Sequence, residues 1–376
     1  MDPWIRTPDA LHALVRSLEG CRAIGLDTES DSLYHHFEKV CLVQLATDRG
    51  QQVLIDTLAV RDLSPLAPAL ADPGLAKVLH GADYDVTTLK RDFSFRFASL
   101  FDTMIAARLL GRAEIGLAAV ARDLLGVRLS KDNQKDDWSR RPLTPQQEAY
   151  ALADVAHLVP LRERLEAELD EKGRLPWLIE ECEAVAALTP LARKQHDPQA
   201  YLSIKGARRL APRALAALRE LATWRERLAE QTDTPAFKIA GNELLLQLAV
   251  QRPRELRALP PLPPRLQRRQ GELLEALRRA EAQPQDALPS VPRQPRPTMS
   301  EEALRRVQRL RAWRARKAAE LQVDVSVVLP QRLIDRLAEA TPGDGDGLLA
   351  LDGLRRWRVE AFGRELLAAL AEAGGA

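Results

Sequence analysis

The segment RAIGLDTES, residues 22–30, decides the fold of the front half of this chain. Its apolar start predicts a buried strand. Side chains two apart in a strand leave on the same face, so Asp27 and Glu29 are expected side by side. A carboxylate among apolar residues is costly unless it is paired or binds a metal. Oxygen ligands of this kind suit Mg²⁺ or Mn²⁺.

Two further segments place carboxylates next to apolar runs. Asp85 lies in HGADYDVTTL, residues 80–89, and Asp154 lies in YALADV, residues 150–155. Tyr150 and Asp154 are four apart in a predicted helix, so they share a face. Two divalent ions held by such a cluster can hydrolyse a phosphodiester. We therefore predict that these acids meet in one metal site.

Each motif has a plainer interpretation when it is taken alone. An Asp-x-Glu pair in a strand commonly faces solvent, and a tyrosine at helical spacing commonly belongs to the core. Asp85 could be an ordinary first-turn acid, favoured by the helix dipole.

The segments around these acids alternate between strand and helix patterns. Strands are predicted in KVCLVQLATD (39–48), QQVLID (51–56) and AKVLHG (76–81), because they are apolar and rich in β-branched residues. Helices are predicted around residues 63–70, from residue 83, over 116–126 with a terminal glycine, and from Pro145 through Glu168. Strands followed by helices on one sheet indicate a layered α/β architecture.

The rear half has a different composition. Residues 1–200 carry 24 Lys and Arg against 31 Asp and Glu, whereas residues 201–376 carry 31 against 22, and the two parts sum to the net charge of +2. This asymmetry favours a metal-binding unit joined to a unit that binds a polyanion. A solvated, arginine-rich helical surface is the alternative. Phosphate contact is expected from the stretches 265–269 and 305–316.

A weak internal repeat lies on either side of a proline-rich stretch, residues 282–298. Trp224 aligns with Trp313 and Leu244 with Leu333 without a gap, which indicates two copies of one small helical bundle. At this spacing the two tryptophans are expected to anchor bundle cores rather than to stack on bases.

The bulk composition limits the class of protein. A length of 376 residues predicts two or three domains. Three cysteines (Cys21, Cys41 and Cys182) do not form CxxC pairs, so a disulfide framework or a zinc site is not expected. No signal-peptide pattern or long apolar stretch is found, and a cytoplasmic location is expected.

Residues 20–160 resemble the tyrosine-bearing branch of the DEDD superfamily of 3′→5′ exonucleases. LDTES, HGADYDVTTL and YALADV match its three motifs, and KVCLVQLAT, FDTMIAARLLG and KDDWSRRPLTPQQEAYALADV follow the pattern of the ribonuclease D family. The repeated helical segments resemble HRDC domains, which are nucleic-acid-binding accessories. In the second copy, DVSVVLP replaces the usual proline-aromatic stretch.

The resemblance implies a ribonuclease H-like α/β exonuclease domain, with a mixed sheet flanked by helices, followed by two small all-α HRDC-like bundles. The expected boundaries are residues 1–172 for the exonuclease domain, 173–209 for a helical connector, 210–281 for the first bundle, 282–299 for a linker and 300–376 for a degenerate second bundle.

The resemblance also assigns roles to single residues. It implies that Asp27, Glu29, Asp85 and Asp154 are ligands of two Mg²⁺ or Mn²⁺ ions, with Asp27 bridging them. Tyr150 would orient the attacking water, and His80 is expected to be structural. In the second motif Asp83 competes with Asp85, and the motif's spacing from His80 favours Asp85. Lys135 and Trp138 are expected beside the active site, where a lysine and a stacking tryptophan would suit a single-stranded 3′ end. The alternative is that Trp138 only covers its own loop and that neither residue contacts the substrate.

The expected function is a metal-dependent 3′→5′ exoribonuclease that releases nucleoside 5′-monophosphates. Its partners would be RNA 3′ ends, those of tRNA precursors and other small structured RNAs. One alternative is a DNA-directed exonuclease of the same superfamily, because metals act on phosphate and only contacts to the 2′-hydroxyl distinguish the sugar. The other is a non-catalytic nucleic-acid-binding protein, which would have no use for the clustered charge.

Overall fold

The computed structural model describes residues 2–130, 132–193, 197–291 and 299–371. The chain forms two compact units. The first comprises residues 1–29, 40–191 and 297–376, and the second comprises residues 30–39 and 192–296.

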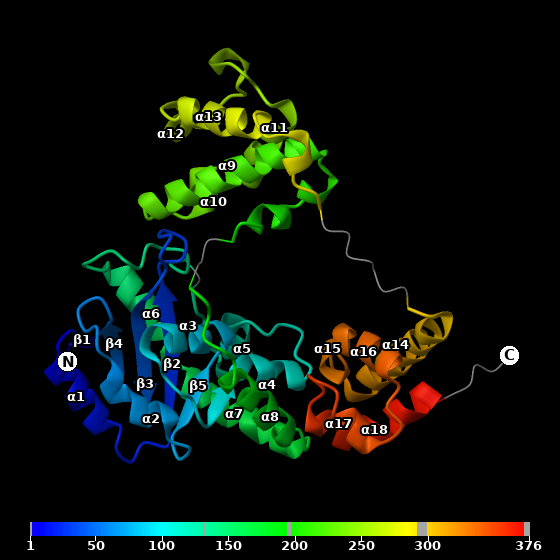
Figure 1. The fold of residues 1–376 in the computed structure, drawn as a ribbon. Coiled ribbons are helices and arrows are strands. Elements are labelled where there is room, and N and C mark those ends of the chain that lie inside the picture. The colour runs from blue at the N-terminus through cyan, green and yellow to red at the C-terminus, as the bar shows by residue number, and fades with distance from the viewer. Residues whose placement is uncertain (1, 131, 194–196, 292–298, 372–376) are drawn as a thin grey trace. The chain divides into compact units, whose positions relative to one another are not determined.

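A six-stranded mixed sheet in the order β1-β4-β3-β2-β5-β6 lies at the centre of the first unit (Figure 1). β2 pairs with β5, β5 with β6 and β1 with β4 in parallel, whereas β3 and β4 are antiparallel. The strands are β1 (Trp4–Ile5), β2 (Ala23–Ser30), β3 (Val40–Thr47), β4 (Gln52–Asp56), β5 (Ala76–Leu79) and β6 (Leu100–Asp102). The four longer strands confirm the predictions, and the two shortest were not predicted.

Helices cover this sheet and fix where the site can form. The elements are α1 (Pro8–Ser17), η1 (Ser64–Leu66), α2 (Ala67–Ala71), α3 (Asp83–Phe93), α4 (Thr103–Leu109), α5 (Leu117–Leu125), α6 (Pro145–Ala156), α7 (Leu158–Glu171) and α8 (Leu175–Ala186). α6 packs on β3 and β4, α7 on β5 and β3, and α8 on β6. Every residue of β3 is buried, which explains its almost continuous apolar sequence.

The helix predicted from Pro145 through Glu168 is two helices, because the chain leaves helical geometry at His157, with φ −109° and ψ −2°. Pro160 has no N–H to donate to the carbonyl of Ala156, so one continuous helix would lose a hydrogen bond at this point. The predicted start is confirmed. The Thr144 side chain accepts from the Gln147 N–H, and the Gln147 side chain accepts from the Thr144 N–H.

The second unit contains the first helical bundle. Its elements are η2 (Ala200–Ser203), η3 (Ala207–Arg209), α9 (Pro212–Gln231), α10 (Ala236–Ile239), α11 (Asn242–Gln251), η4 (Leu256–Ala258), α12 (Pro264–Gln267), α13 (Gln270–Glu281) and η5 (Gln285–Ala287). α9 packs against both α11 and α13. Trp224 of α9 is 7% exposed and belongs to this core, as predicted.

The second helical bundle belongs to the first unit. It comprises α14 (Glu301–Leu321), α15 (Val325–Val328), α16 (Gln331–Ala340), α17 (Gly345–Leu349) and α18 (Arg356–Ala371). Its core is continuous with that of the sheet domain, and α18 packs on α8, as the orange and red ribbons of Figure 1 show beside α8. Trp313 is buried in this core, as predicted.

The connector expected over residues 173–209 is divided between the units, because α8 packs on β6 and η2 packs on α9. Residues 292–298 of the proline-rich stretch lie outside the described part of the chain. Among the described helices, none combines the length and the apolar character needed to cross a lipid bilayer.

Candidate active site

Three of the predicted acids meet at one point. Asp27 and Glu29 on β2 and Asp154 on α6 each offer a carboxylate oxygen, and these oxygens lie within 4.8 Å of one another. Tyr150 lies one helical turn before Asp154 on the same face of α6. Together with Asp85, these residues line a cavity of about 330 Å³.

Gly25 explains how α6 and α7 come so close to β2. A Cβ atom at this position would lie 3.0 Å from both the Leu158 Cβ and the Val155 carbonyl oxygen. A glycine inside a strand permits such a close approach of another backbone. The missing side chain therefore brings Asp154, one residue before Val155, to the strand that carries Asp27.

The second motif places Asp85 rather than Asp83 at the site. Asp85 is buried on α3 and accepts a hydrogen bond from the Thr28 hydroxyl, which is itself on β2. Asp83 is exposed and does not line the cavity. The structure thus resolves the choice that the sequence left open.

Asp102 fixes the turn that precedes α3 and thereby the orientation of this helix. Its carboxylate accepts from the Gly81 N–H at 3.0 Å and from the Ala82 N–H at 2.8 Å, immediately before α3 begins. The same side chain caps the start of α4 by accepting from Met104 and Ile105. One buried carboxylate therefore sets the direction of the helix that carries Asp85.

Burial raises the pKa values of all four acids, and the neighbouring carboxylates of the cluster raise those of Asp27 and Glu29 further. Burial is the largest cause for Asp27, and Asp85, Glu29 and Asp154 raise its pKa further. Burial and the neighbouring carboxylates raise the pKa of Glu29 to about 9. Burial also raises the pKa of Asp85 to about 7 and that of Asp154 to about 6.

Within the described part of the chain, no basic side chain is among the causes that set these four pKa values. Buried carboxylates without a protein counter-charge are characteristic of a cation site. The donor set, which consists of carboxylate oxygens, fits Mg²⁺ or Mn²⁺.

Tyr150 keeps its proton in this environment. Burial is the main cause that raises its pKa, and the charges of Asp154 and Glu29 add to it. A protonated phenol can donate to Asp154 and orient a water, but it cannot act as a base. The water-orienting role that the resemblance implies for Tyr150 stays a prediction.

His80 borders the cavity and is held by the protein. Its Nδ1 lies 2.9 Å from the Thr103 Oγ1, and burial lowers its pKa. These contacts agree with the expected structural role.

The expectation that Trp138 stacks on a nucleotide does not fit its position. Its side chain is 1% exposed, and its ring centroid lies 6.0 Å from that of Tyr150. A base cannot reach a ring that is covered on both faces, so Trp138 supports Tyr150 instead. Lys135 is exposed in the same loop, and Gln134 beside it lines the cavity.

Gly25, Thr28 and Asp102 were not singled out from the sequence, although they shape the site. A glycine inside an apolar strand two residues before an aspartate is a detectable signal of close backbone approach. The roles of Thr28 and Asp102 depend on partners 57 and 20 residues away, respectively, and no local pattern reveals them.

Comparisons with known proteins identify the family of the chain. A family model described as 3′-5′ exonuclease matches residues 3–170, and the HRDC domain model matches residues 214–277 and 303–370. The chain is 34% identical to ribonuclease D of Pseudomonas paraeruginosa, over 98% of both chains.

Two solved structures are similar as well. The structure of Escherichia coli RNase D, described as an exoribonuclease involved in structured RNA processing, has 27% identity and a TM-score of 0.69, with 98% of both chains covered. The catalytic core of RRP6 from Trypanosoma brucei has 28% identity and a TM-score of 0.67, with 74% of this chain and 79% of that chain covered.

The two family models together match the sheet domain and both helical bundles, and with 34% identity over nearly the whole length of a ribonuclease D, the chain belongs to the ribonuclease D family of 3′→5′ exoribonucleases.

Proposed function

We propose that this chain removes nucleotides one at a time from the 3′ end of RNA, as nucleoside 5′-monophosphates, with the help of two divalent ions. The observation that carries the proposal is the cluster of Asp27, Glu29 and Asp154, whose oxygens lie within 4.8 Å of one another without a basic partner among the described residues. Such a cluster is costly to retain unless cations neutralise it.

The four acids would bind the two ions in different combinations. Glu29 and Asp154 would hold one ion with Asp27, and Asp85 would support the other with Asp27. When bound, the ions activate the attacking water and neutralise charge on the phosphate and the leaving oxygen. Thr28 fixes the Asp85 carboxylate through its hydroxyl. Tyr150, which keeps its proton, would hold the attacking water in line through a hydrogen bond of its hydroxyl group.

The substrates proposed are tRNA precursors and other small structured RNAs with a single-stranded 3′ end. The described function of E. coli RNase D in structured RNA processing supports this class of substrate. Lys135, which is exposed in the loop beside the cavity, would contact a phosphate of the 3′ end. We place the reaction in the cytoplasm, and the three free, buried cysteines agree with a reducing compartment.

One experiment tests polarity, metal dependence and product together. Purified protein is incubated with 5′-labelled RNA that carries a single-stranded 3′ tail, with Mg²⁺ or Mn²⁺ and in parallel with a chelator. A ladder that shortens by single nucleotides, only with metal, is expected. The proposal fails if the protein binds this RNA with metal present and leaves it uncut. A matched DNA strand that is cut equally fast would show that the sugar is not selected.

A further inference from the structure

Helix α8 lies between the second bundle and the helix that carries Asp85. It packs on α18 of the bundle and on α3, α4 and β6 of the sheet domain. A helix keeps its shape and rises by only about 1.5 Å per residue, so neighbouring residues of α8 move together. What the bundle does to one face of α8 is therefore passed to the elements on its other faces.

On the bundle side, two adjacent glutamates of α8 hold the start of α18. The Glu180 carboxylate accepts from the Arg356 N–H and from the Trp357 N–H, each at 2.7 Å. The first N–H groups of a helix have no acceptor within it, and the helix dipole favours a negative charge beside them. Glu181 accepts from the Arg358 Nη1 at 2.6 Å. The start of α18 is therefore fixed to α8 by two carboxylates.

The residue before α8 joins the bundle as well. Arg174 is 7% exposed, and its guanidinium bridges the ends of two helices. Its Nη1 donates to the Leu109 carbonyl oxygen at the end of α4, at 2.7 Å, and its Nη2 donates to the Leu321 carbonyl oxygen at the end of α14, at 2.8 Å. A cation is favoured at both places by the helix dipoles. The bundle thus holds α8 at its start and in its middle.

On the side of the active site, α8 contacts α3 near both of its ends. The Cys182 Sγ accepts from the Asp102 N–H at 3.3 Å, and the Asp102 carboxylate fixes the turn before α3. Lys90, in the last turn of α3, donates from its Nζ to the carbonyl oxygen of Ala186 at 2.5 Å and to that of Leu188 at 2.7 Å. The position of α3 therefore depends on that of α8.

The position of α3 in turn decides where the Asp85 carboxylate lies. Asp85 is in the first turn of α3, directly after the turn that Asp102 fixes. A side chain that serves a metal has to be held within about 0.5 Å of its productive place. The hydrogen bond from Thr28 fixes the carboxylate itself, but it cannot fix the helix behind it.

We propose that the second bundle is a positioning element of the active site: by holding α8, it fixes α3 and thereby places the Asp85 carboxylate for the second cation. This role requires no contact between the bundle and RNA. It rests on the proposed function, in which Asp85 supports one of two ions.

Two variants of the full chain interrupt this connection at different points. Glu181→Gln removes the charge that pairs with Arg358, on the bundle side of α8. Lys90→Met removes the contact between α3 and the end of α8, on the side of the active site. Both substitutions keep the approximate size of the side chain. Circular dichroism shows whether each variant is folded.

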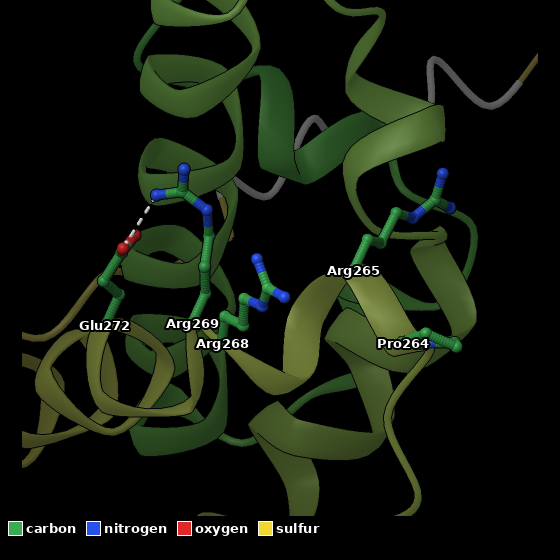
Figure 2. A pocket seen from close by; sticks show the side chains of 5 residues that line it. All are labelled: Pro264, Arg265, Arg268, Arg269 and Glu272. Carbon is green, nitrogen blue, oxygen red and sulfur yellow. Dashed lines mark hydrogen bonds and ion pairs between the residues drawn. The ribbon is translucent and has the colours of Figure 1, made fainter.

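Glu272→Gln in the first bundle is the matched control. Glu272 accepts from the Trp224 Nε1 and from the Arg269 Nη1, each at 2.8 Å, and Figure 2 shows the second of these contacts as a dashed line. Glu181 likewise accepts from an indole N–H and from a guanidinium. The control therefore makes the same chemical change in the other compact unit of the chain.

Hydrogen exchange followed by mass spectrometry, with a chelator present, measures whether α3 is held in place. In Glu181→Gln and in Lys90→Met, exchange over residues 80–85 should become several-fold faster, because the turn before α3 opens more often. Exchange in β3 should stay at the wild-type rate, which separates this local effect from a general loss of stability. Glu272→Gln should leave exchange over residues 80–85 unchanged.

Mn²⁺ binding measures the consequence for the metal site. The free ion is followed by electron paramagnetic resonance, with a nucleoside 5′-monophosphate present as the proposed product. The weaker of two binding steps should lose about 10-fold in affinity in both variants, as is typical when a residue that orients a metal ligand is changed. The tighter step, which Glu29 and Asp154 would supply, should not change, and neither step should change in the control.

Unchanged exchange over residues 80–85 in both variants, or an equal change in the control, would overturn the inference. Faster exchange with wild-type Mn²⁺ affinity would overturn it too, because Asp85 would then not depend on α8. If Glu181→Gln does not fold, Lys90→Met decides, since its contacts lie between α3 and α8.

Cleavage of 3′-tailed RNA by the wild-type chain with Mg²⁺ is followed in parallel, so that the two proposals can fail separately. An RNA that is bound and left uncut contradicts the proposed function. An RNA that is cut, together with variants that match the control in exchange and in Mn²⁺ binding, contradicts only the role of the second bundle.

Discussion

The indole rings of Trp177 and Trp357 stack with centroids 4.4 Å apart and planes 17° from parallel. This stack joins α8 of the sheet domain to α18 of the second bundle. Beside it, Glu181 accepts from the Trp357 Nε1 at 3.0 Å and from the Arg358 Nη1. The second bundle therefore shares one hydrophobic core with the sheet domain.

Trp357→Ala should lower the free energy of unfolding by about 3–5 kcal/mol, because it leaves a cavity in that shared core. Urea unfolding followed by near-ultraviolet circular dichroism measures the loss. Leu304→Ala, on the same bundle but at a side chain that is 48% exposed, is the control and should change stability by less than about 0.5 kcal/mol. Similar losses in both variants would contradict the shared core.

Gly111→Ala should destabilise the contact between the sheet domain and the second bundle. Gly111 has φ +79°, and a Cβ atom there would lie 1.9 Å from the Gln322 carbonyl oxygen at the end of α14. Gly126→Ala is a matched control, since Gly126 has φ +70° with nothing within 4 Å. The control should cost about 1–2 kcal/mol of unfolding free energy from backbone strain alone. If both variants lost the same free energy of unfolding, the close approach of Gly111 to Gln322 would not contribute to stability.

Asp27→Asn should abolish cleavage while RNA affinity remains near the wild-type value. The substitution removes a central ligand of the proposed ions but none of the positively charged side chains that would bind RNA. Single-turnover cleavage and anisotropy on one preparation measure the two effects. Asp83→Asn, at the exposed acid two residues before Asp85, is the control and should cleave normally. A variant at Asp27 that cleaves as fast as wild type would end the metal-site assignment.

Tyr150→Phe should lower kcat by roughly 10²-fold, in the range typical of a positioned proton-transfer or water-orienting group, with little change in KM. The ring remains to pack against Trp138, so stability should change little. Because burial and nearby acids raise the pKa of Tyr150, its phenol stays protonated over the working range. The residual activity of the variant should therefore rise with pH no differently from wild type. If kcat of the wild-type enzyme, but not of the variant, changed at alkaline pH, the tyrosine would ionise in the working range.

Stability without metal should fall as pH rises. The pKa of Glu29 is raised from 4.5 to about 9, so between these values the folded chain binds more protons than the unfolded chain. The free energy of unfolding then decreases with increasing pH. Asp85 acts in the same direction from 3.8 up to about 7. Urea titrations with a chelator, from about pH 5 to about pH 9, should show this decline.

Saturating Mg²⁺ should remove most of that decline, because the cation binds the ionised carboxylates. Glu29→Gln should flatten the pH dependence in chelator, since the amide cannot ionise. A metal-free wild-type chain whose stability increases over this interval would show that the acids are not clustered in solution.

Much of the catalytic domain follows from local pattern. The apolar runs of β2, β3, β4 and β5 and the Thr144–Pro145 start of α6 are visible in the sequence, because side-chain periodicity and capping act over a few residues. β1 and β6 are two and three residues long, too short for any periodicity to show. The break at His157 depends on Pro160, a local signal that the expectation of one long helix overlooked.

The sequence by itself determined which residues are the candidates for the chemistry, because the four acids and Tyr150 stand in motifs whose order and spacing are local properties of the chain. Only the tertiary structure decided between Asp83 and Asp85, buried Trp138, and joined the second bundle to α8. These outcomes depend on contacts between residues far apart in the chain, and the energy of such contacts is set by burial and close packing, which no short stretch of sequence encodes.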